Sequence, residues 1–272
     1  MKSCDATTVE TRELIAMSYE HIKLEEAEEF STIIMSRAHR RNSLTEEHLR
    51  ELFDAFSVVA ESDARGVVLA AEGPVFSSGH DFNDMYGRDL DSMKKLLDLC
   101  GEFMQLLQRI PQPVIAQVEG LATAAGCQLV ASCDFAVAGE SAHFQMPGGG
   151  SGWFCHTPGV ALVRAVGRKR AVEMLLTGDP IDSRTAADWG LINRVVPDNE
   201  VVEQTRQLLQ RATRGSRYSK GEGKKALYRQ MDLDIAGAYD LAAEVMAETS
   251  QSVDGQEQMI SFLEKRRPEF RS

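Results

Sequence analysis

Short apolar runs near the start of the chain have the composition of strands. The segments 15–22 (IAMSYEHI) and 30–36 (FSTIIMS) contain β-branched and aromatic residues, and the acidic run 25–29 separates them. A third run, 66–71 (GVVLAA), is apolar throughout, as expected of a strand buried on both faces of a parallel sheet. We therefore predict three strands in this part of the chain.

Two further segments carry apolar residues at helical spacing. Ser43 followed by Glu46 is the pattern of a capping box, which predicts the start of a helix that ends near Asp63. A second amphipathic helix is predicted over 91–110. Strands and helices therefore alternate from the beginning of the chain.

The alternation continues through the middle of the sequence. A strand introduced by prolines is predicted over 111–120, a turn of small residues running into a helix over 120–134, and two short strands over 134–146. Strands that alternate with helices are typical of an α/β fold with parallel pairing. The sequence therefore predicts the α/β class.

The strand signal ends at about residue 199, and the remaining segments are helical. The predicted helices cover 199–213, 218–230, 235–251 and 255–266. This change predicts two parts: a core over 1–198 and a helical C-terminal region over 199–272.

Composition limits the classes of partner. The 272 residues include 43% hydrophobic residues, enough for a substantial core, and 30 Lys and Arg against 41 Asp and Glu give a formal charge of −11. This acidic balance argues against binding nucleic acid or anionic membranes through a broad basic surface. It leaves room for a local basic pocket that binds an anionic ligand.

Cysteine usage and the N-terminus indicate a cellular compartment. The five cysteines are an odd number without a CxxC pair, which opposes a disulfide framework or a structural zinc site. The first 17 residues lack an apolar core and contain three acidic residues, which opposes a signal or transit peptide. No apolar run is long enough to cross a membrane. We expect a soluble, cytoplasmic protein.

Two strand-to-helix transitions are rich in small residues. One is 76–82 (FSSGHDF) and the other is 122–127 (ATAAGC). N–H groups at the start of a helix are unpaired and favour negative charge, so two such sites facing each other would form an oxyanion hole. The alternative is that small residues only allow close packing of helix on sheet.

Longer segments carry a family resemblance. RRNSL, VFSSGHDF, PVIAQVEGLATAAGCQLVASCDFAVAGESAHFQMP and TGDPIDSRTAADWGLINRVVP occur in the order in which similar segments occur in the enoyl-CoA hydratase/isomerase (crotonase) superfamily. DGQEQMISFLEKRRPEF continues the pattern, so the resemblance runs from about residue 12 to the C-terminus.

The resemblance implies a spiral of ββα repeats followed by an all-helical trimerisation region, with a homotrimer or a dimer of trimers. It also implies a coenzyme A thioester as substrate, with no permanently bound cofactor. The thioester oxygen would be held by the N–H groups of His80 and Ala125. An enolate carries its charge on that oxygen, and paired donors would stabilise it.

Two departures from the family pattern concern the reaction. Hydratases of the superfamily use two glutamates, and the matching positions here are Gln128 and Gly148. Neither residue can transfer a proton as a carboxylate does, and general acid–base catalysis contributes roughly 10²–10⁴ per group. We therefore expect hydration to be weak.

His80 suggests another reaction. The segment VFSSGHD resembles the decarboxylase branch of the superfamily, which has a histidine at this place and a tyrosine where Cys155 stands. Decarboxylation needs an oxyanion hole but no carboxylate base. A third hypothesis is a protein that binds acyl-CoA without catalysis.

Each candidate side chain also has a structural interpretation. His80 could turn away to bond Asp81 or solvent, Cys155 could be a buried inert thiol, and Gln128 could bond the loop backbone. Cys155 and His156 are adjacent, but adjacent side chains seldom point at one another.

Cations are needed for the phosphates of coenzyme A. The resemblance implies Arg40 and Arg41 near the first helix and Phe262 with Lys265 near the C-terminus, the latter pair acting on a neighbouring subunit's ligand. Surface-exposed charges are the alternative for each. The resemblance also assigns residues beside the oxyanion hole to ligand binding, namely Ser78, His80, Asp81, Phe82 and Ala125. The remaining histidines do not cluster with carboxylates, so we predict no metal site.

Overall fold

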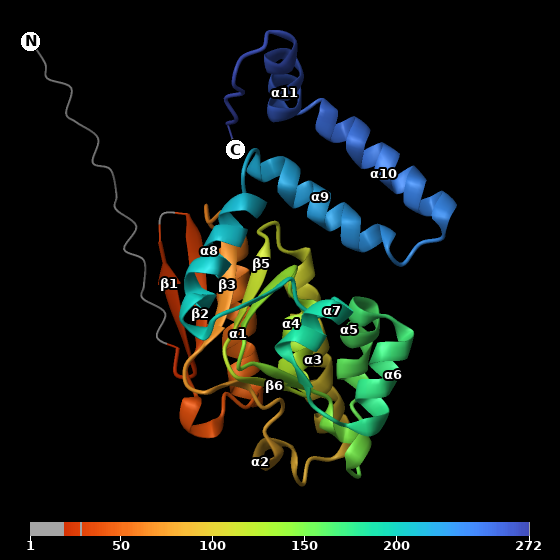
Figure 1. Ribbon diagram of the computed structural model, residues 1–272. Coiled ribbons are helices and arrows are strands. Elements are labelled where there is room, and N and C mark those ends of the chain that lie inside the picture. The colour runs from red at the N-terminus through yellow and green to blue at the C-terminus, as the bar shows by residue number, and fades with distance from the viewer. Residues whose placement is uncertain (1–18, 28, 272) are drawn as a thin grey trace, which may run out of the picture.

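The computed structural model describes residues 19–27 and 29–271 (Figure 1). The described strands are β1 (Ile22–Glu26), β2 (Phe30–Met35), β3 (Gly66–Ala71), β4 (Val75–Ser77), β5 (Val114–Val118), β6 (Leu121–Thr123), β7 (Phe135–Gly139), β8 (His143–Gln145), β9 (Ile181–Asp182) and β10 (Arg194–Val196). The described helices of the core are η1 (Ala38–Arg40), α1 (Glu46–Ala60), α2 (Phe82–Met85), α3 (Leu90–Arg109), α4 (Ala125–Ser132), η2 (Pro147–Gly150), α5 (His156–Val166), α6 (Arg168–Thr177), α7 (Ser183–Trp189) and η3 (Asp198–Glu200).

The strands form two sheets between which the chain passes repeatedly. The larger sheet has the order β1-β2-β3-β5-β7-β10 and the smaller sheet has the order β4-β6-β8-β9. Within each sheet the pairs formed by β3, β5 and β7, and by β4, β6 and β8, are parallel. The units β3-β4-α3, β5-β6-α4 and β7-β8-α5 therefore repeat, and the predicted spiral of ββα units is confirmed.

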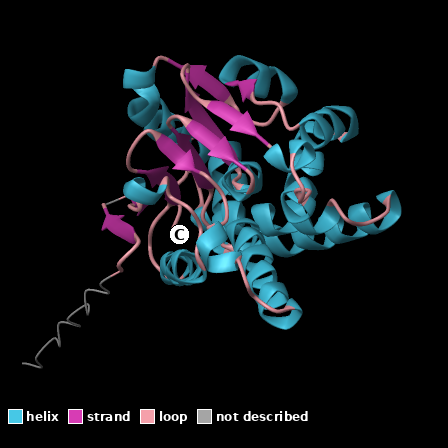
Figure 2. Cartoon of the chain, turned by 90° about the horizontal axis from the view of Figure 1, so that it is seen from below, coloured by secondary structure: helices cyan, strands magenta, loops and turns pink. Residues whose placement is uncertain are grey.

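Helices cover the sheets from outside (Figure 2). Apolar side chains of α1 and α3, including Phe56 and Phe103 with ring centroids 5.5 Å apart, form the main core with the strands. On the other side of the larger sheet, Leu209 packs into a second cluster with Ile115 and Val137. These two cores fix the sheet from both faces.

Most of the predicted elements are confirmed, with two corrections at the N-terminal end. The first strand covers Ile22–Glu26 and includes acidic residues that the prediction placed between strands. It is an edge strand, where charged side chains reach solvent and deter pairing with another chain. The predicted segment 15–18 lies outside the described residues.

The capping prediction for α1 is wrong by two residues. Thr45 is the N-cap, and its side chain accepts a hydrogen bond from the His48 N–H. Ser43 instead donates through its hydroxyl to Asp81. Glu46 binds arginines rather than the helix start, and α1 ends at Ala60, short of Asp63.

The C-terminal region is helical, as predicted. It contains α8 (Val201–Ala212), α9 (Arg217–Gln230), α10 (Ile235–Ser250) and α11 (Val253–Leu263). Helix α8 packs on β5 and β7, whereas α10 and α11 extend away from the core (Figure 1). The predicted boundary between residues 198 and 199 stays a prediction, because α8 lies after it in the sequence but packs on the sheet of the core.

Candidate active site

A cleft of about 540 Å³ opens at the end of the molecule where β4 and β6 end. Most of the predicted site residues line it: Arg40, Arg41, Ser78, His80, Asp81, Phe82, Ala125, Gly148 and Cys155. Because β4 and β6 are parallel neighbours, the turns that follow them meet at the same edge of the sheet. The sheet topology thus brings together segments that are about 45 residues apart in the sequence.

The two turns approach each other at backbone distance. Gly79 has a φ of +82°, and a Cβ placed there would lie 3.0 Å from the Ala125 nitrogen and 2.8 Å from the Ala124 Cβ. A Cβ on Gly126 would lie 2.3 Å from the Ser77 carbonyl oxygen. Small residues therefore permit close packing here, and the same packing sets the two peptide groups side by side.

The His80 and Ala125 N–H groups are left free by this arrangement. Leu44 donates to the Gly79 oxygen (2.8 Å) and accepts from the Asp81 N–H (3.0 Å), which fixes the backbone on both sides of His80. Within residues 19–27 and 29–271, neither the His80 N–H nor the Ala125 N–H has an acceptor. Ala125 begins α4, whose N-terminus adds a favourable dipole.

Ala124 adopts a backbone conformation that L-residues rarely use. Its φ of 51° and ψ of −121° turn the chain from β6 into α4, and its own N–H donates to the Gln145 oxygen (3.0 Å). Such strain persists only where the surrounding structure imposes it. Here the turn directs the Ala125 N–H toward the cleft wall that carries Gly79.

The His80 side chain makes no well-formed hydrogen bond to the described residues, although the Leu44 backbone lies near the ring. Both ring nitrogens are buried without a hydrogen bond. Burial lowers the pKa of His80, while the Leu44 backbone and the charge of Asp84 oppose this shift, so the imidazole is neutral at pH 7. The hypothesis that the ring turns away to bond Asp81 or solvent is therefore wrong.

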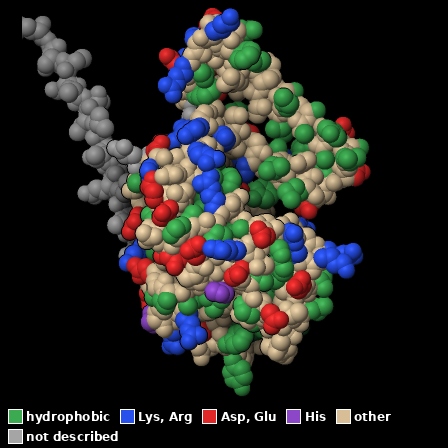
Figure 3. Space-filling view, viewed as in Figure 1, with side chains coloured by type: hydrophobic (Ala, Val, Ile, Leu, Met, Phe, Trp, Pro, Cys, Tyr) green, Lys and Arg blue, Asp and Glu red, His purple; other side chains and the backbone are tan. Residues whose placement is uncertain are grey.

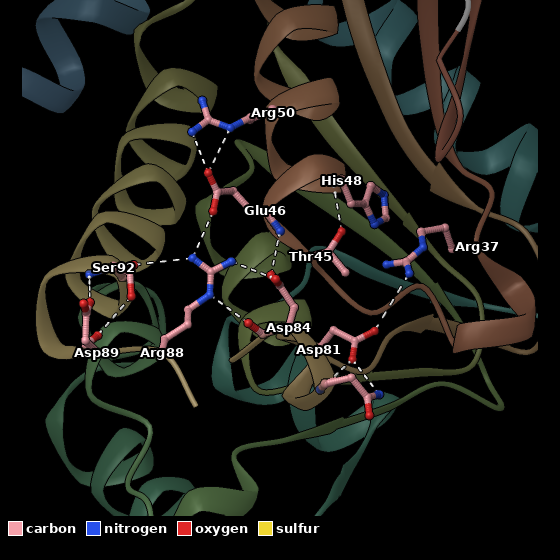
Figure 4. A network of polar contacts seen from close by, with 11 residues as sticks. Arg37, Thr45, Glu46, His48, Arg50, Asp81, Asp84, Arg88, Asp89 and Ser92 are labelled. Carbon is pink, nitrogen blue, oxygen red and sulfur yellow. Dashed lines mark hydrogen bonds and ion pairs between the residues drawn. The ribbon is translucent and has the colours of Figure 1, made fainter. Parts of the chain in front are cut away.

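Asp81 is occupied by other donors (Figure 4). Its carboxylate accepts from the Ser43 hydroxyl at 2.8 Å and from the backbone and side-chain nitrogens of Asn83 at 3.0 Å, and it lies 3.9 Å from Arg37. Burial raises the pKa of Asp81, but these hydrogen bonds and Arg37 outweigh it and hold the pKa below its usual value. Asp81 thus fixes the turn that presents His80.

The position matching the second glutamate is filled by another segment. A Cβ on Gly148 would lie 2.6 Å from the Cys155 nitrogen and the Trp153 oxygen, and 2.8 Å from the Cys155 Sγ. No side chain fits there unless this segment moves. Burial raises the pKa of the Cys155 thiol, so it is protonated at neutral pH.

Gln128 lies on α4 with only 3% of its surface exposed, and it does not line the cleft. Its side-chain oxygen has no partner in the described part of the chain, so this atom does not contribute to the predicted bonding of the amide to the loop backbone. His156 stacks edge-on against Phe154, with ring centroids 5.1 Å apart, rather than pairing with its neighbour Cys155.

The predicted cations lie in two places. Arg40 and Arg41 line the cleft, and the backbone oxygen of Arg41 accepts from the Ser78 N–H at 3.0 Å. Phe262 and Lys265 lie on or beside α11, at the end of the molecule opposite α2 (Figure 1). Within one chain these two residues therefore do not reach the cleft.

Sequence reasoning missed several residues that line the cleft: His39, Leu97, Trp153, Phe154 and Pro158. Trp153 and Phe154 occur in the segment GWFC, but nothing in its spacing indicated that it would fold over Gly148. Among the described residues no group of three His, Cys, Asp or Glu side chains could hold a metal ion. No helix in that part of the chain is long and apolar enough to cross a membrane.

Comparison with known proteins shows similarity over nearly the whole chain. The model of the enoyl-CoA hydratase/isomerase family matches residues 25–272. Enoyl-CoA hydratase domain-containing protein 3, mitochondrial, from Rattus norvegicus is 44% identical over 238 residues, which are 87% of this chain and 79% of the relative. The segments ATAAGCQLVASCD and FCHTPGVAL resemble the same protein.

Solved structures also resemble this chain in both fold and sequence. An enoyl-CoA hydratase from Mycobacterium smegmatis has a TM-score of 0.89 and 41% identity, covering 93% of this chain and 100% of that one. The human enoyl-CoA hydratase domain-containing protein 3 has a TM-score of 0.87 and 40% identity, covering 92% and 100%. The predicted fold and the predicted resemblance are both confirmed.

Proposed function

Because the chain belongs to the enoyl-CoA hydratase/isomerase family, we propose that its cleft binds a coenzyme A thioester and stabilises the enolate of the acyl group. The observation that carries this proposal is the pair of free N–H groups of His80 and Ala125 beside each other in one cleft. No permanently bound cofactor is required.

The two N–H groups would act on the thioester oxygen. When a bond to the α-carbon breaks, its electron pair moves toward the carbonyl and charge builds up on that oxygen. Donors fixed in a site that excludes water stabilise this charge without reorganising, and loss of one such donor costs about 10²–10³ in rate. Arg40 and Arg41 would bind the phosphates at the cleft rim.

Hydration by the family's two-glutamate mechanism is expected to be weak. Gln128 cannot take up a proton usefully, and the Cys155 segment occupies the space beside Gly148. The protein therefore lacks the groups that would activate water and return a proton, each worth roughly 10²–10⁴. Enolate stabilisation does not depend on them.

A second candidate is decarboxylation, which the unpaired imidazole of His80 favours. The bond between the α-carbon and the carboxylate would break, CO₂ would leave, and the electron pair would form the enolate held by the two N–H groups. The neutral His80 ring, after turning one of its buried nitrogens into the cleft, would donate a hydrogen bond to the carboxylate before it leaves, and the enolate would then take a proton from water. A protein that only binds acyl-CoA is the remaining alternative.

Calorimetry with a matched ligand pair tests the main proposal. A butyryl thioester of coenzyme A and its thioether analogue differ by the carbonyl oxygen alone. We expect the thioester to bind about tenfold more tightly, because only it can accept from both N–H groups. Equal affinities for the thioester and the thioether would contradict the proposed oxyanion hole. Assays for turnover of crotonyl-, malonyl- and methylmalonyl-CoA then distinguish hydration and decarboxylation from binding without catalysis.

We also propose that the chain assembles as a homotrimer or a dimer of trimers through 199–272. Helix α10 has no buried residue in the single chain, and it exposes Ile235, Tyr239 and Met246. In such an assembly Phe262 and Lys265 would reach a neighbouring subunit's ligand. The expected cytoplasmic location stays a prediction; the rat relative is named mitochondrial, and imaging of the full chain fused to a fluorescent protein would decide.

A further inference from the structure

We propose that the cleft selects coenzyme A thioesters with a long, uncharged acyl chain, and that Phe82 and Trp153 set this preference. This inference rests on the acyl-CoA function proposed above. It adds the class of acyl group and the two side chains that would recognise it.

Phe82 and Trp153 form an aromatic pair at the cleft that is still open to solvent. Phe82 begins α2, Trp153 lies between η2 and α5, and their ring centroids are 6.4 Å apart. The two residues are 72% and 48% exposed although both line the cleft. Two rings from separate segments thus offer apolar surface that the protein itself leaves uncovered.

An apolar chain is the occupant that this wall fits. Covering exposed aromatic surface is favourable in proportion to the apolar area removed from water. An acetyl group held at the two N–H groups offers little surface for this purpose, whereas a longer chain can lie along the rings. Leu97, Phe154 and Pro158 continue the apolar lining of the same cleft.

A charged acyl group finds no arginine or lysine on the segments that carry Phe82 and Trp153 within the cleft. The arginines that line the cleft, Arg40 and Arg41, come from the segment at η1 and not from α2 or the Trp153 segment. The Asp81 carboxylate is already bonded by Ser43 and Asn83. A carboxylate placed against the two rings would lose water without gaining an ion pair with Arg or Lys.

Polar contacts between α1, α2 and Arg88 anchor the helix that carries Phe82 (Figure 4). Arg88 donates to Glu46 of α1 at 3.0 Å and to Asp84 of α2 at 2.7 Å. Asp84 in turn accepts from the Glu46 N–H at 2.9 Å. This four-residue helix is therefore anchored by charges rather than by burial of the Phe82 ring, and the ring stays available to a ligand.

The same segment supplies a matched control. Tyr86 is 93% exposed and follows Phe82 by one helical turn, but it does not line the cleft. The space-filling view shows an apolar protrusion at the lower end of the molecule, where Figure 1 places α2 (Figure 3). A general effect of removing an exposed ring would appear in both variants, whereas an effect on the acyl chain would appear only with Phe82.

The test is the affinity of the full chain for a series of straight-chain thioesters from acetyl- to palmitoyl-CoA, with free coenzyme A as the reference. We expect wild-type affinity to rise with chain length, by at most about fourfold per methylene that becomes buried. Phe82→Ala and Trp153→Ala should each weaken palmitoyl-CoA binding about tenfold or more and flatten the rise. Tyr86→Ala should follow the wild type, and thermal unfolding of each variant checks its fold.

The outcomes separate the two proposals. If wild-type protein binds all the thioesters with the same affinity at every chain length, but more tightly than free coenzyme A, this inference is overturned and the proposed function stands. A rise that persists unchanged in both variants also overturns it. If neither coenzyme A nor any thioester binds, the proposed function fails and this inference fails with it.

Discussion

Gly79 lies at a point where the proposed oxyanion hole is sensitive to substitution. Its φ is +82°, and an added Cβ would meet the Ala125 nitrogen and the Ala124 Cβ. We expect Gly79→Ala to push the two N–H groups apart and to abolish most of the preference for thioester over thioether, a loss of about tenfold. Calorimetry with the two ligands measures this loss.

Gly87 provides a control that distinguishes the effect of backbone strain from the effect of steric displacement at Gly79. It has nearly the same φ, +83°, but no atom lies within 4 Å of an added Cβ. Gly87→Ala should therefore lower stability by about 1 kcal/mol, as positive φ requires, and leave the thioester preference intact. Equal losses of preference in both variants would contradict the role given to Gly79.

Restoring the two glutamates should not restore hydration. A side chain at 148 would overlap the Trp153 oxygen and the Cys155 nitrogen, so the double variant Gln128→Glu, Gly148→Glu must displace that segment. We expect it to lose about 1–3 kcal/mol of stability and to stay inactive on crotonyl-CoA, as followed by enoyl absorbance. Gly152→Ala, in the same segment with open space around it, should change neither property. Fast hydration by the double variant would show that the segment containing Trp153 and Cys155 can move to make room for the new side chain, and would contradict this prediction.

His48 should make stability depend on pH. It is fully buried, and burial lowers its pKa from 6.5 to about 4, while its Nδ1 lies 3.1 Å from the Ser43 oxygen. Between about pH 6.5 and pH 4 the unfolded chain binds a proton that the folded chain does not, so stability falls as pH falls, by about 3 kcal/mol in total. Urea unfolding at several pH values measures this slope. His48→Asn should flatten it, whereas a variant of the exposed His143 should not.

At the scale of elements, apolar patterning predicted the strands and helices that are buried, and local signals failed where tertiary contacts decide. The run 66–71 became β3 without correction, because its residues face the core on both sides. Ser43 has the right spacing for a cap, but Asp81, which is distant in sequence, takes its hydroxyl. The close contact between the Trp153 segment and Gly148 depends on two loops meeting in space, and such a contact produces no periodic pattern in the sequence.

A buried ion pair is one of the contacts that attach helix α9 to the core, beside the hydrogen bond from Tyr228 to the same Asp134. Lys224 lies 2.6 Å from Asp134 and also donates to the Leu107 and Gln112 oxygens. We expect Lys224→Met to cost about 3–5 kcal/mol in urea unfolding, because Asp134 would stay buried without its counter-charge. The next residue is the control, since Lys225 pairs with Glu222 at the surface and its replacement should cost about 0.5 kcal/mol. Similar costs at both positions would show that the pair does not hold α9.

For the whole molecule, the net charge of −11 and the positions of the cations on a single chain both lead us to expect that assembly and ligand binding are coupled. An acidic protein that binds a phosphate-bearing ligand must place its cations locally, and Arg40 and Arg41 lie at the cleft rim while Lys265 lies at the far end of the chain. Lys265 can serve a cleft only if that cleft belongs to another subunit. Assembly and ligand binding should therefore be coupled.

The coupling between assembly and ligand binding can be tested by separating the subunits. Hydrophobic side chains gather on the arm formed by α9, α10 and α11 (Figure 3), and two of them, Tyr239 and Met246, are 72% and 76% exposed on α10. The proposed assembly would cover this patch, as a partner generally covers exposed apolar patches. Light scattering should give wild-type protein the mass of three or six chains of 30.0 kDa, and the double variant Tyr239→Glu, Met246→Glu should be monomeric. Because the monomer lacks a neighbour's Lys265, its affinity for coenzyme A should fall by about tenfold or less, as a partly exposed ion pair requires. Leu90→Glu, at an equally exposed apolar position away from the arm, should leave the mass unchanged; a wild-type monomer would contradict the proposed assembly.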